Sequence, residues 1–141
     1  MDNTSNGKLP DIRHTLVLNA PIEKVWKAVA TAEGISAWFM PNNFEPVEGF
    51  EFQLNAGPWG NSPCKVTLID KPNRLSFNWG KDWSVTFELV QQGDHTEFTL
   101  IHGGWTADQV TEFEEAHDIV RGRMDKGWAG IVQKLAGYVE A

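Results

Sequence analysis

The sequence predicts an α+β domain in which a curved antiparallel sheet of about six to seven strands wraps around one long C-terminal helix. Two observations carry this prediction. Apolar and polar residues alternate through most of positions 50–102, the pattern of antiparallel strands covered on one face only. After Gly103-Gly104 the apolar residues recur at steps of three and four, the pattern of an amphipathic helix. One apolar sheet face and one apolar helix stripe can bury each other.

A strand and two short helices precede the meander. Ile12, Val17 and Leu18 indicate a first strand within residues 11–19. A helix is expected to begin at Ala20-Pro21-Ile22-Glu23, because Pro suits the first helical position and Glu the first turn. Its apolar stripe is Ile22, Val25, Trp26 and Val29. Thr31-Ala32-Glu33 predicts a second start, followed by Ile35, Trp38 and Phe39 before Pro41.

Five alternating runs then predict five strands joined by short turns. Their apolar positions are Phe50, Phe52 and Leu54; Val66 and Leu68; Leu75, Phe77 and Trp79; Trp83, Val85, Phe87 and Leu89; and Phe98, Leu100 and His102. Three of the connections have the turn chemistry of hairpins: Lys71-Pro72-Asn73, Gly80-Lys81-Asp82 and Gln92-Gly93-Asp94.

The last apolar stripe predicts a long helix, which Thr106 and Gln109 begin as a capping box. Its members are Val110, Phe113, His117, Val120, Met124, Trp128, Ile131, Leu135 and Tyr138. About eight unbroken turns would measure roughly 50 Å, which is long for so small a domain. We therefore expect a bend or break near Gly122 or Gly127.

Length and composition predict one intracellular domain. Residues 1–10 are expected to form a flexible N-terminus, and residues 11–141 a single domain. One cysteine rules out an internal disulfide, and no signal peptide or transmembrane run is recognisable, so a cytoplasmic location is expected. A formal charge of −7 with twelve dispersed basic residues argues against nucleic acid and against an anionic membrane surface.

Several local motifs resemble the START-like superfamily (SRPBCC), whose fold is called helix-grip. Within it the chain resembles the AHSA family, homologues of the C-terminal domain of the ATPase activator for the ninety-kilodalton heat-shock protein. The matching pieces are Ala20-Pro21-Ile22-Glu23-Lys24-Val25-Trp26-Lys27-Ala28, Trp38-Phe39-Met40-Pro41, Val85-Thr86-Phe87-Glu88-Leu89, Thr96-Glu97-Phe98-Thr99-Leu100, His102-Gly103-Gly104-Trp105, and Gly127-Trp128 with Ile131 and Leu135. The resemblance spans about residues 11–139. It implies an apolar ligand held between sheet and C-terminal helix, or a chaperone partner and a role in the stress response.

The candidate ligand cavity consists of aromatic and apolar side chains with two histidines. Its predicted residues are Trp38, Phe39, Phe52, Trp59, Phe77, Trp79, Val85, Phe87, His102, His117, Val120 and Met124. His102 and His117 fall on apolar faces, where each is either a satisfied core residue or a polar group that orients a ligand. Arg121 could pair with an acidic ligand, or with Glu114, Glu115 or Asp118. Trp26 and Trp128 are expected in the core.

No motif points to a metal, a cofactor or a defined reaction. The sequence has neither Cys-x-x-Cys nor His-Glu-x-x-His, so no metal site is expected. His102-Gly103-Gly104-Trp105 lacks the Gly-x-Ser-x-Gly nucleophile elbow that an esterase needs. Three hypotheses follow: non-catalytic binding of a lipid, an aromatic or a polyketide-like molecule; a co-chaperone-type interaction protein; and a cyclase, hydrolase or dehydratase that uses the same cavity.

Overall fold

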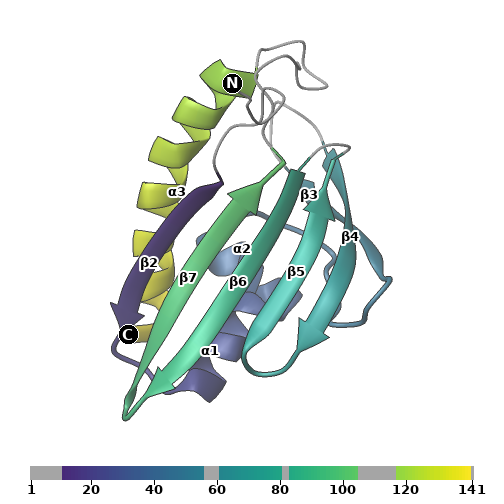
Figure 1. Ribbon diagram of the computed structural model, residues 1–141. Helices are drawn as coiled ribbons and strands as arrows, with labels where there is room; N and C mark the ends of the chain where they lie inside the picture. The colour runs from purple at the N-terminus through teal and green to yellow at the C-terminus, as the bar shows by residue number, and fades with distance from the viewer. Residues whose placement is uncertain (1–10, 56–60, 81–82, 105–116, 141) are drawn as a thin grey trace, which may run out of the picture.

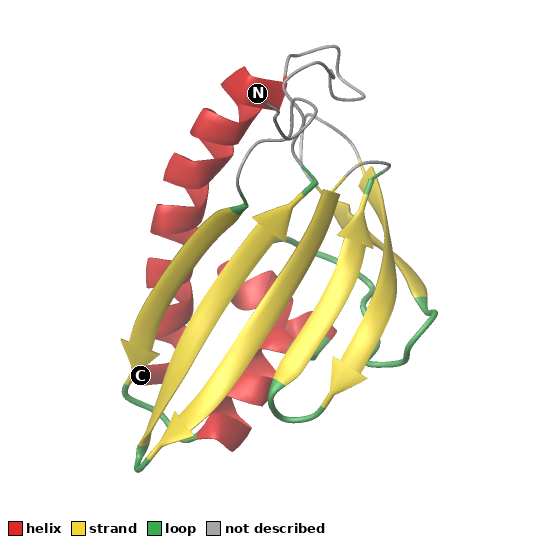
Figure 2. Ribbon diagram, viewed as in Figure 1, coloured by secondary structure: helices red, strands yellow, loops and turns green. Residues whose placement is uncertain are grey.

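The computed structural model describes residues 11–55, 61–80, 83–104 and 117–140, with the side chains of the last segment described from Arg121 onward. The predicted flexible N-terminus, the loop with Trp59 and the capping box at Thr106 lie outside these residues. One sheet and three helices make up the described part. All three helices lie on the same face of the sheet (Figures 1 and 2).

The sheet has six antiparallel strands in the order β2-β7-β6-β5-β4-β3, which confirms the predicted α+β class. The strands are β2 (Ile12–Leu18), β3 (Glu51–Asn55), β4 (Asn61–Asp70), β5 (Arg74–Trp79), β6 (Trp83–Gln92) and β7 (His95–Gly103). The helices are α1 (Ile22–Val29), α2 (Ala32–Trp38) and α3 (His117–Glu140).

The predicted alternation places one apolar row of each strand against the helices. Phe77 pairs with Val85, and Val85 in turn pairs with His102 across three adjacent strands. All three side chains are at most 2% exposed. Period two is therefore enough to identify the buried face wherever the strands are regular.

Two strands depart from the simple alternation. A register shift between Val66 and Leu68 sets Ile69 opposite the buried Leu75, and Leu68 opposite Ser76. Leu68, predicted on the inner face, consequently lies on the outer one, because a bulge reverses the facing of every later side chain. In β2, Val17 is 53% exposed, since the inner face takes the even-numbered residues from Ile12 to Leu18.

The two short helices form as predicted. Every member of the α1 stripe is buried, with Pro21 at the N-cap rather than at the first helical position. The Thr31 hydroxyl caps α2 by accepting a hydrogen bond of 3.0 Å from the Gly34 amide. At the other end of α2 the Trp38 indole donates to the Ala28 carbonyl of α1 at 2.7 Å. This bond locks the helices to each other.

Of the bend or break expected in the C-terminal helix near Gly122 or Gly127, the break is wrong. Helix α3 runs through Gly122 and Gly127 without interruption for 24 residues, a length of about 36 Å. Its buried positions are Trp128, Val132, Leu135 and Val139, whereas Tyr138 is 42% exposed. The predicted stripe is thus displaced by one residue at the end of the helix. No helix in the described part of the chain is long and apolar enough to cross a membrane.

Candidate functional site

His102 lies at the centre of a group of aromatic rings contributed by both layers of the fold. Its imidazole is fully buried, and its Nδ1 accepts a hydrogen bond of 2.8 Å from the indole Nε1 of Trp128 on α3. Trp79 of β5 stacks on the imidazole at a centroid distance of 5.4 Å, and Trp83 of β6 meets it edge-on at 5.0 Å. Three tryptophans therefore surround one histidine.

Phe39, at the end of α2, completes this group. Its ring lies 4.9 Å from that of Trp128 and 5.7 Å from that of Trp79, centroid to centroid. We name the five side chains Phe39, Trp79, Trp83, His102 and Trp128 the His102 cluster. They come from β5, β6, β7, α3 and the residue that follows α2, and they gather where β5 and β7 end and β6 begins.

Burial keeps the imidazole of His102 neutral. Loss of hydration, and after it the positive charge of Arg121, lower the pKa of His102 from 6.5 to about 3. Because Nδ1 accepts the Trp128 hydrogen bond, the proton of the neutral ring resides on Nε2. The neutral imidazole of His102 is therefore an N–H donor within the His102 cluster.

Part of the His102 cluster is open to solvent. Phe39, Trp83 and the neighbouring Met124 of α3 are half-buried, whereas Trp79, His102 and Trp128 are at most 4% exposed. Trp79, His102 and Trp128 thus form the buried part of the cluster. The half-buried apolar side chains Phe39, Trp83 and Met124 are called its rim. Such a boundary can accept an apolar molecule when the rim side chains change rotamer.

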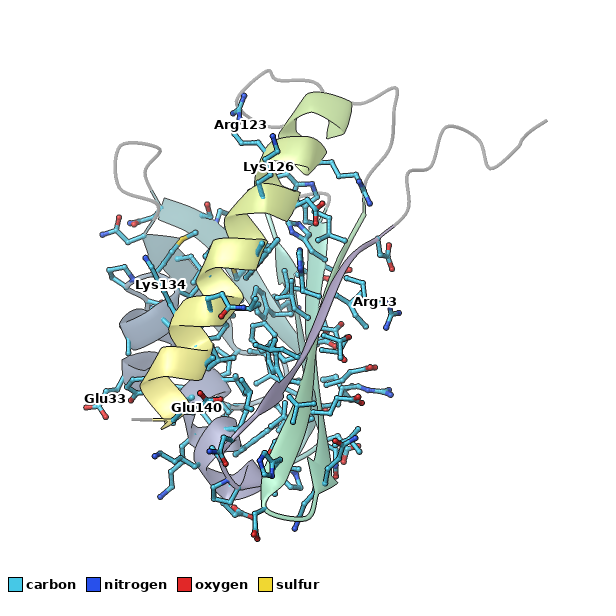
Figure 3. All side chains as sticks on the ribbon, turned by 90° about the vertical axis from the view of Figure 1, so that its left-hand side faces the viewer. Arg13, Glu33, Arg123, Lys126, Lys134 and Glu140 are labelled. Carbon is cyan, nitrogen blue, oxygen red and sulfur yellow. The ribbon has the colours of Figure 1, made fainter. Side chains whose placement is uncertain are left out.

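The deeper layer between sheet and helices is filled with side chains (Figure 3). Trp38 packs edge-on against Phe87 at 5.6 Å, and Phe77 packs against Phe87 at 6.0 Å, centroid to centroid. Of the predicted cavity residues, Trp38, Phe52, Phe77, Val85 and Phe87 are core residues at most 2% exposed. These five contribute stability and shape.

The other predicted cavity residues are divided between the His102 cluster and undescribed positions. Phe39, Trp79 and His102 belong to the cluster, and Met124 is half-buried one helical turn before Trp128. Trp59 lies outside the described residues, as do the side chains of His117 and Val120. Trp83 and Trp128 were absent from the predicted cavity set. The alternation of β6 and the helical stripe of α3 had placed both side chains on the inner faces. The sequence therefore contained the pattern that could have added them to the predicted cavity.

Three hollows lined by described residues include no member of the His102 cluster among their lining residues. The first, of about 580 Å³, involves β3, β4 and β5; the second, of about 470 Å³, lies between α1 and the end of α3; the third, of about 220 Å³, adjoins the first. Phe52 is the one predicted cavity residue that lines any of the three.

Polar contacts connect β2 and the residue before it with α3. Nε2 of His14 and Oδ1 of Asp125 share a hydrogen bond of 2.8 Å, which the sequence did not predict. Arg121 donates to the Asp11 carbonyl at 3.4 Å. Its suggested acidic partners Glu114, Glu115 and Asp118 lie outside the side chains that the structure describes. Among described residues no group of three His, Cys, Asp or Glu side chains could hold a metal ion.

An antiparallel sheet that grips a C-terminal helix through an aromatic layer defines the chain as a START-like (SRPBCC) protein with the helix-grip fold. More narrowly, it belongs to the family described as activator of Hsp90 ATPase homolog 1-like protein, which matches residues 19–140. No curated protein matches the chain.

Solved structures agree with this assignment. The solution structure of Bacillus halodurans protein BH1534 is 44% identical, with a TM-score of 0.86, covering 95% of this chain and 99% of that one. The Aha1 dimer from Colwellia psychrerythraea is 18% identical, with a TM-score of 0.76 and coverage of 94% and 97%. CalU16 from Micromonospora echinospora is 23% identical, with a TM-score of 0.74 and coverage of 92% and 75%. The last two likenesses concern the fold alone.

Proposed function

We propose that this protein binds a small, largely apolar molecule bearing a hydrogen-bond acceptor, and that it does so at the His102 cluster without transforming the molecule. The single observation that supports this is a neutral imidazole N–H donor enclosed by aromatic rings beside a half-buried apolar rim. Aromatic walls favour a flat ligand, so aromatic or polyketide-like molecules fit better than a flexible lipid chain. A cytoplasmic site of action is part of the proposal.

The titration behaviour of the site favours binding over catalysis. A histidine whose pKa is about 3 stays neutral near pH 7 and is a weak proton acceptor, so His102 is poorly suited to general base catalysis. Burial also raises the pKa of Cys64 to about 12, which leaves the thiol protonated and unreactive. Neither group therefore supplies the activated nucleophile or base that a cyclase, hydrolase or dehydratase would need.

The test is a change of volume beneath the His102 cluster. Val85 is fully buried and is the register partner of His102, so Val85→Trp is expected to push the cluster into the space a ligand would occupy. Overpacking of this kind costs about 1–3 kcal/mol, which a folded domain can survive. We expect the folded variant to lose at least tenfold in affinity for an apolar fluorescent dye, measured by titration with fold checked by circular dichroism.

Val90→Trp is the matched control. Val90 lies on the same strand but is 51% exposed, so the same added volume projects into solvent and dye affinity should be unchanged. Undiminished dye binding by folded Val85→Trp would contradict the proposed site. Native mass spectrometry against a metabolite library would then identify the ligand class of the unmodified protein.

The co-chaperone hypothesis is a second candidate, supported by the family description. Its test is the ATPase rate of the ninety-kilodalton heat-shock protein with and without this chain. Stimulation that survives Val85→Trp, together with absent dye binding, would favour the interaction protein and a stress-response role over the ligand carrier.

A further inference from the structure

We propose a second ligand site on the uncovered face of the sheet, for a neutral, hydroxyl-rich molecule of the carbohydrate or polyol class. The hollow of about 580 Å³ lies over β3, β4 and β5, the strands at the right of Figure 1. Its exposed side chains are those of Asn43, Glu51, Gln53, Pro63, Lys65 and Asn78. In the strands these residues alternate with buried ones, so their side chains point away from the helices.

The hollow continues into a second one. The adjoining hollow of about 220 Å³ shares Asn43 and Gln53 with the first, and adds the cross-strand pair Asn55 and Asn61. Together they form a groove, here called the amide groove, along the outer face of β3 and β4. Its combined volume falls within the range of small-molecule sites.

Carboxamide side chains dominate the amide groove. Gln53, Asn61 and Asn78 are exposed, and their side chains make no hydrogen bond to another described residue. Asn43 is engaged through its Oδ1, which accepts a hydrogen bond of 2.7 Å from the backbone N–H of Gln53. Each carboxamide offers both a donor and an acceptor, as each hydroxyl of a sugar or polyol does. A row of such groups can therefore bind several neighbouring hydroxyls.

Sheet stability does not account for these residues. Asn is depleted in strands, where Thr or Val packs better on an exposed pleated surface. Pro63 is no exception to the rules for strands, because it lies one residue beyond the last β4–β5 pair, Cys64 with Trp79, where its missing N–H costs no ladder bond. Local choices that oppose the local structure are expected at functional positions. The Pro63 ring also supplies a flat apolar surface for the C–H face of a sugar.

Charge selects an uncharged ligand. Glu51 and Lys65 are register partners across β3 and β4, so one negative and one positive group face the amide groove together. The groove is locally neutral although the chain carries −7. Glu51 disfavours a polyanion and Lys65 disfavours a polycation, which leaves neutral hydroxyl-bearing molecules as the matching class.

The experiment is an NMR titration of the ¹⁵N-labelled full chain with glucose, maltose, N-acetylglucosamine and sorbitol, each at millimolar concentration. We expect at least one probe to shift the side-chain amide signals of Gln53, Asn61 and Asn78. The double variant Gln53→Thr, Asn78→Thr should weaken that binding at least tenfold. Its melting temperature should be unchanged or higher, because Thr suits a strand better than Asn. Gln92→Thr, an exposed amide at the end of β6, is the matched control and should bind as the unmodified chain does.

Two results would overturn the amide groove as a binding site. One is the absence of shifts with all four probes; the other is binding by the double variant equal to that of the unmodified chain. Apolar dye binding should be the same in the double variant, since the His102 cluster lies on the other face of the sheet. Loss of sugar shifts and loss of dye binding thus report on different sites.

Discussion

The indole Nε1 of Trp128 donates a hydrogen bond of 2.8 Å to Nδ1 of His102, and neither side chain is more than 1% exposed. This bond joins α3 to β7 across an otherwise apolar layer. The bond gives a partner to two polar atoms that would be unfavourable to bury without one. It also sets the tautomer of the imidazole. Stability and the chemistry of the candidate site therefore depend on the same contact.

Trp128→Phe should be more destabilising than the same change at Trp26. The Trp128 variant leaves the buried Nδ1 without its donor, which costs about 1–3 kcal/mol beyond the lost ring area. Trp26 is also buried, but its indole makes no hydrogen bond to another described residue, so Trp26→Phe measures the area term alone. Urea unfolding at constant m-value gives both free energies. Equal losses would show that the hydrogen bond contributes nothing.

Stability should fall as the pH drops from about 6.5 toward 3. The pKa of His102 is lowered from 6.5 to about 3, so within this window the unfolded chain binds a proton that the folded chain does not. The free energy of unfolding then decreases with falling pH by at most about 1.4 kcal/mol per pH unit from this group. Above pH 6.5 both states are neutral and the effect vanishes.

The variant His102→Phe should flatten this pH dependence, measured by urea unfolding at several pH values. His95→Gln is the control, because His95 is exposed at the start of β7. Its replacement should leave the pH dependence of the free energy of unfolding unchanged. A slope that persists in the His102 variant would assign the effect to other groups.

Gly34→Ala should destabilise the protein even though Ala favours a helix. A Cβ at this position would lie 2.6 Å from the carbonyl oxygens of Lys27 and Ala28, which are backbone atoms and cannot turn aside. We expect a net loss of about 1–3 kcal/mol, the usual cost of overpacking. Gly137→Ala in α3 is the matched control, since nothing lies within 4 Å of its Cβ, and it should stabilise by up to about 1 kcal/mol. Thermal unfolding of the two variants would reveal whether their signs differ.

Treatment with EDTA should leave the melting temperature unchanged. A structural metal would contribute binding free energy to folding, and its removal would lower the melting temperature by several degrees. The described side chains contain no cluster of three metal-ligating groups. Calorimetry before EDTA, after EDTA and after addition of zinc measures the melting temperature in each state. A fall in melting temperature that zinc reverses would contradict this prediction.

Periodic patterns made most of the fold predictable. Phe77, Phe87 and Phe98 are buried because alternation along a strand assigns each residue a face, whatever the neighbouring strand contains. The start of α2 was equally local, since the Thr31 hydroxyl caps an amide only three residues away. Such features depend on short stretches of chain, and a short stretch of sequence is enough to specify them.

The tertiary structure decided the features that depend on register and distance. Nothing in the sequence relates His102 to Trp128, 26 positions apart, until β7 and α3 pack together. The bulge that turns Ile69 inward, and the pairing of Glu51 with Lys65 over the amide groove, follow from how adjacent strands align. The sequence by itself determined which faces are apolar. Packing between distant segments determined which atoms meet on those faces, because many alignments bury the same apolar residues and each brings different polar atoms within hydrogen-bond distance.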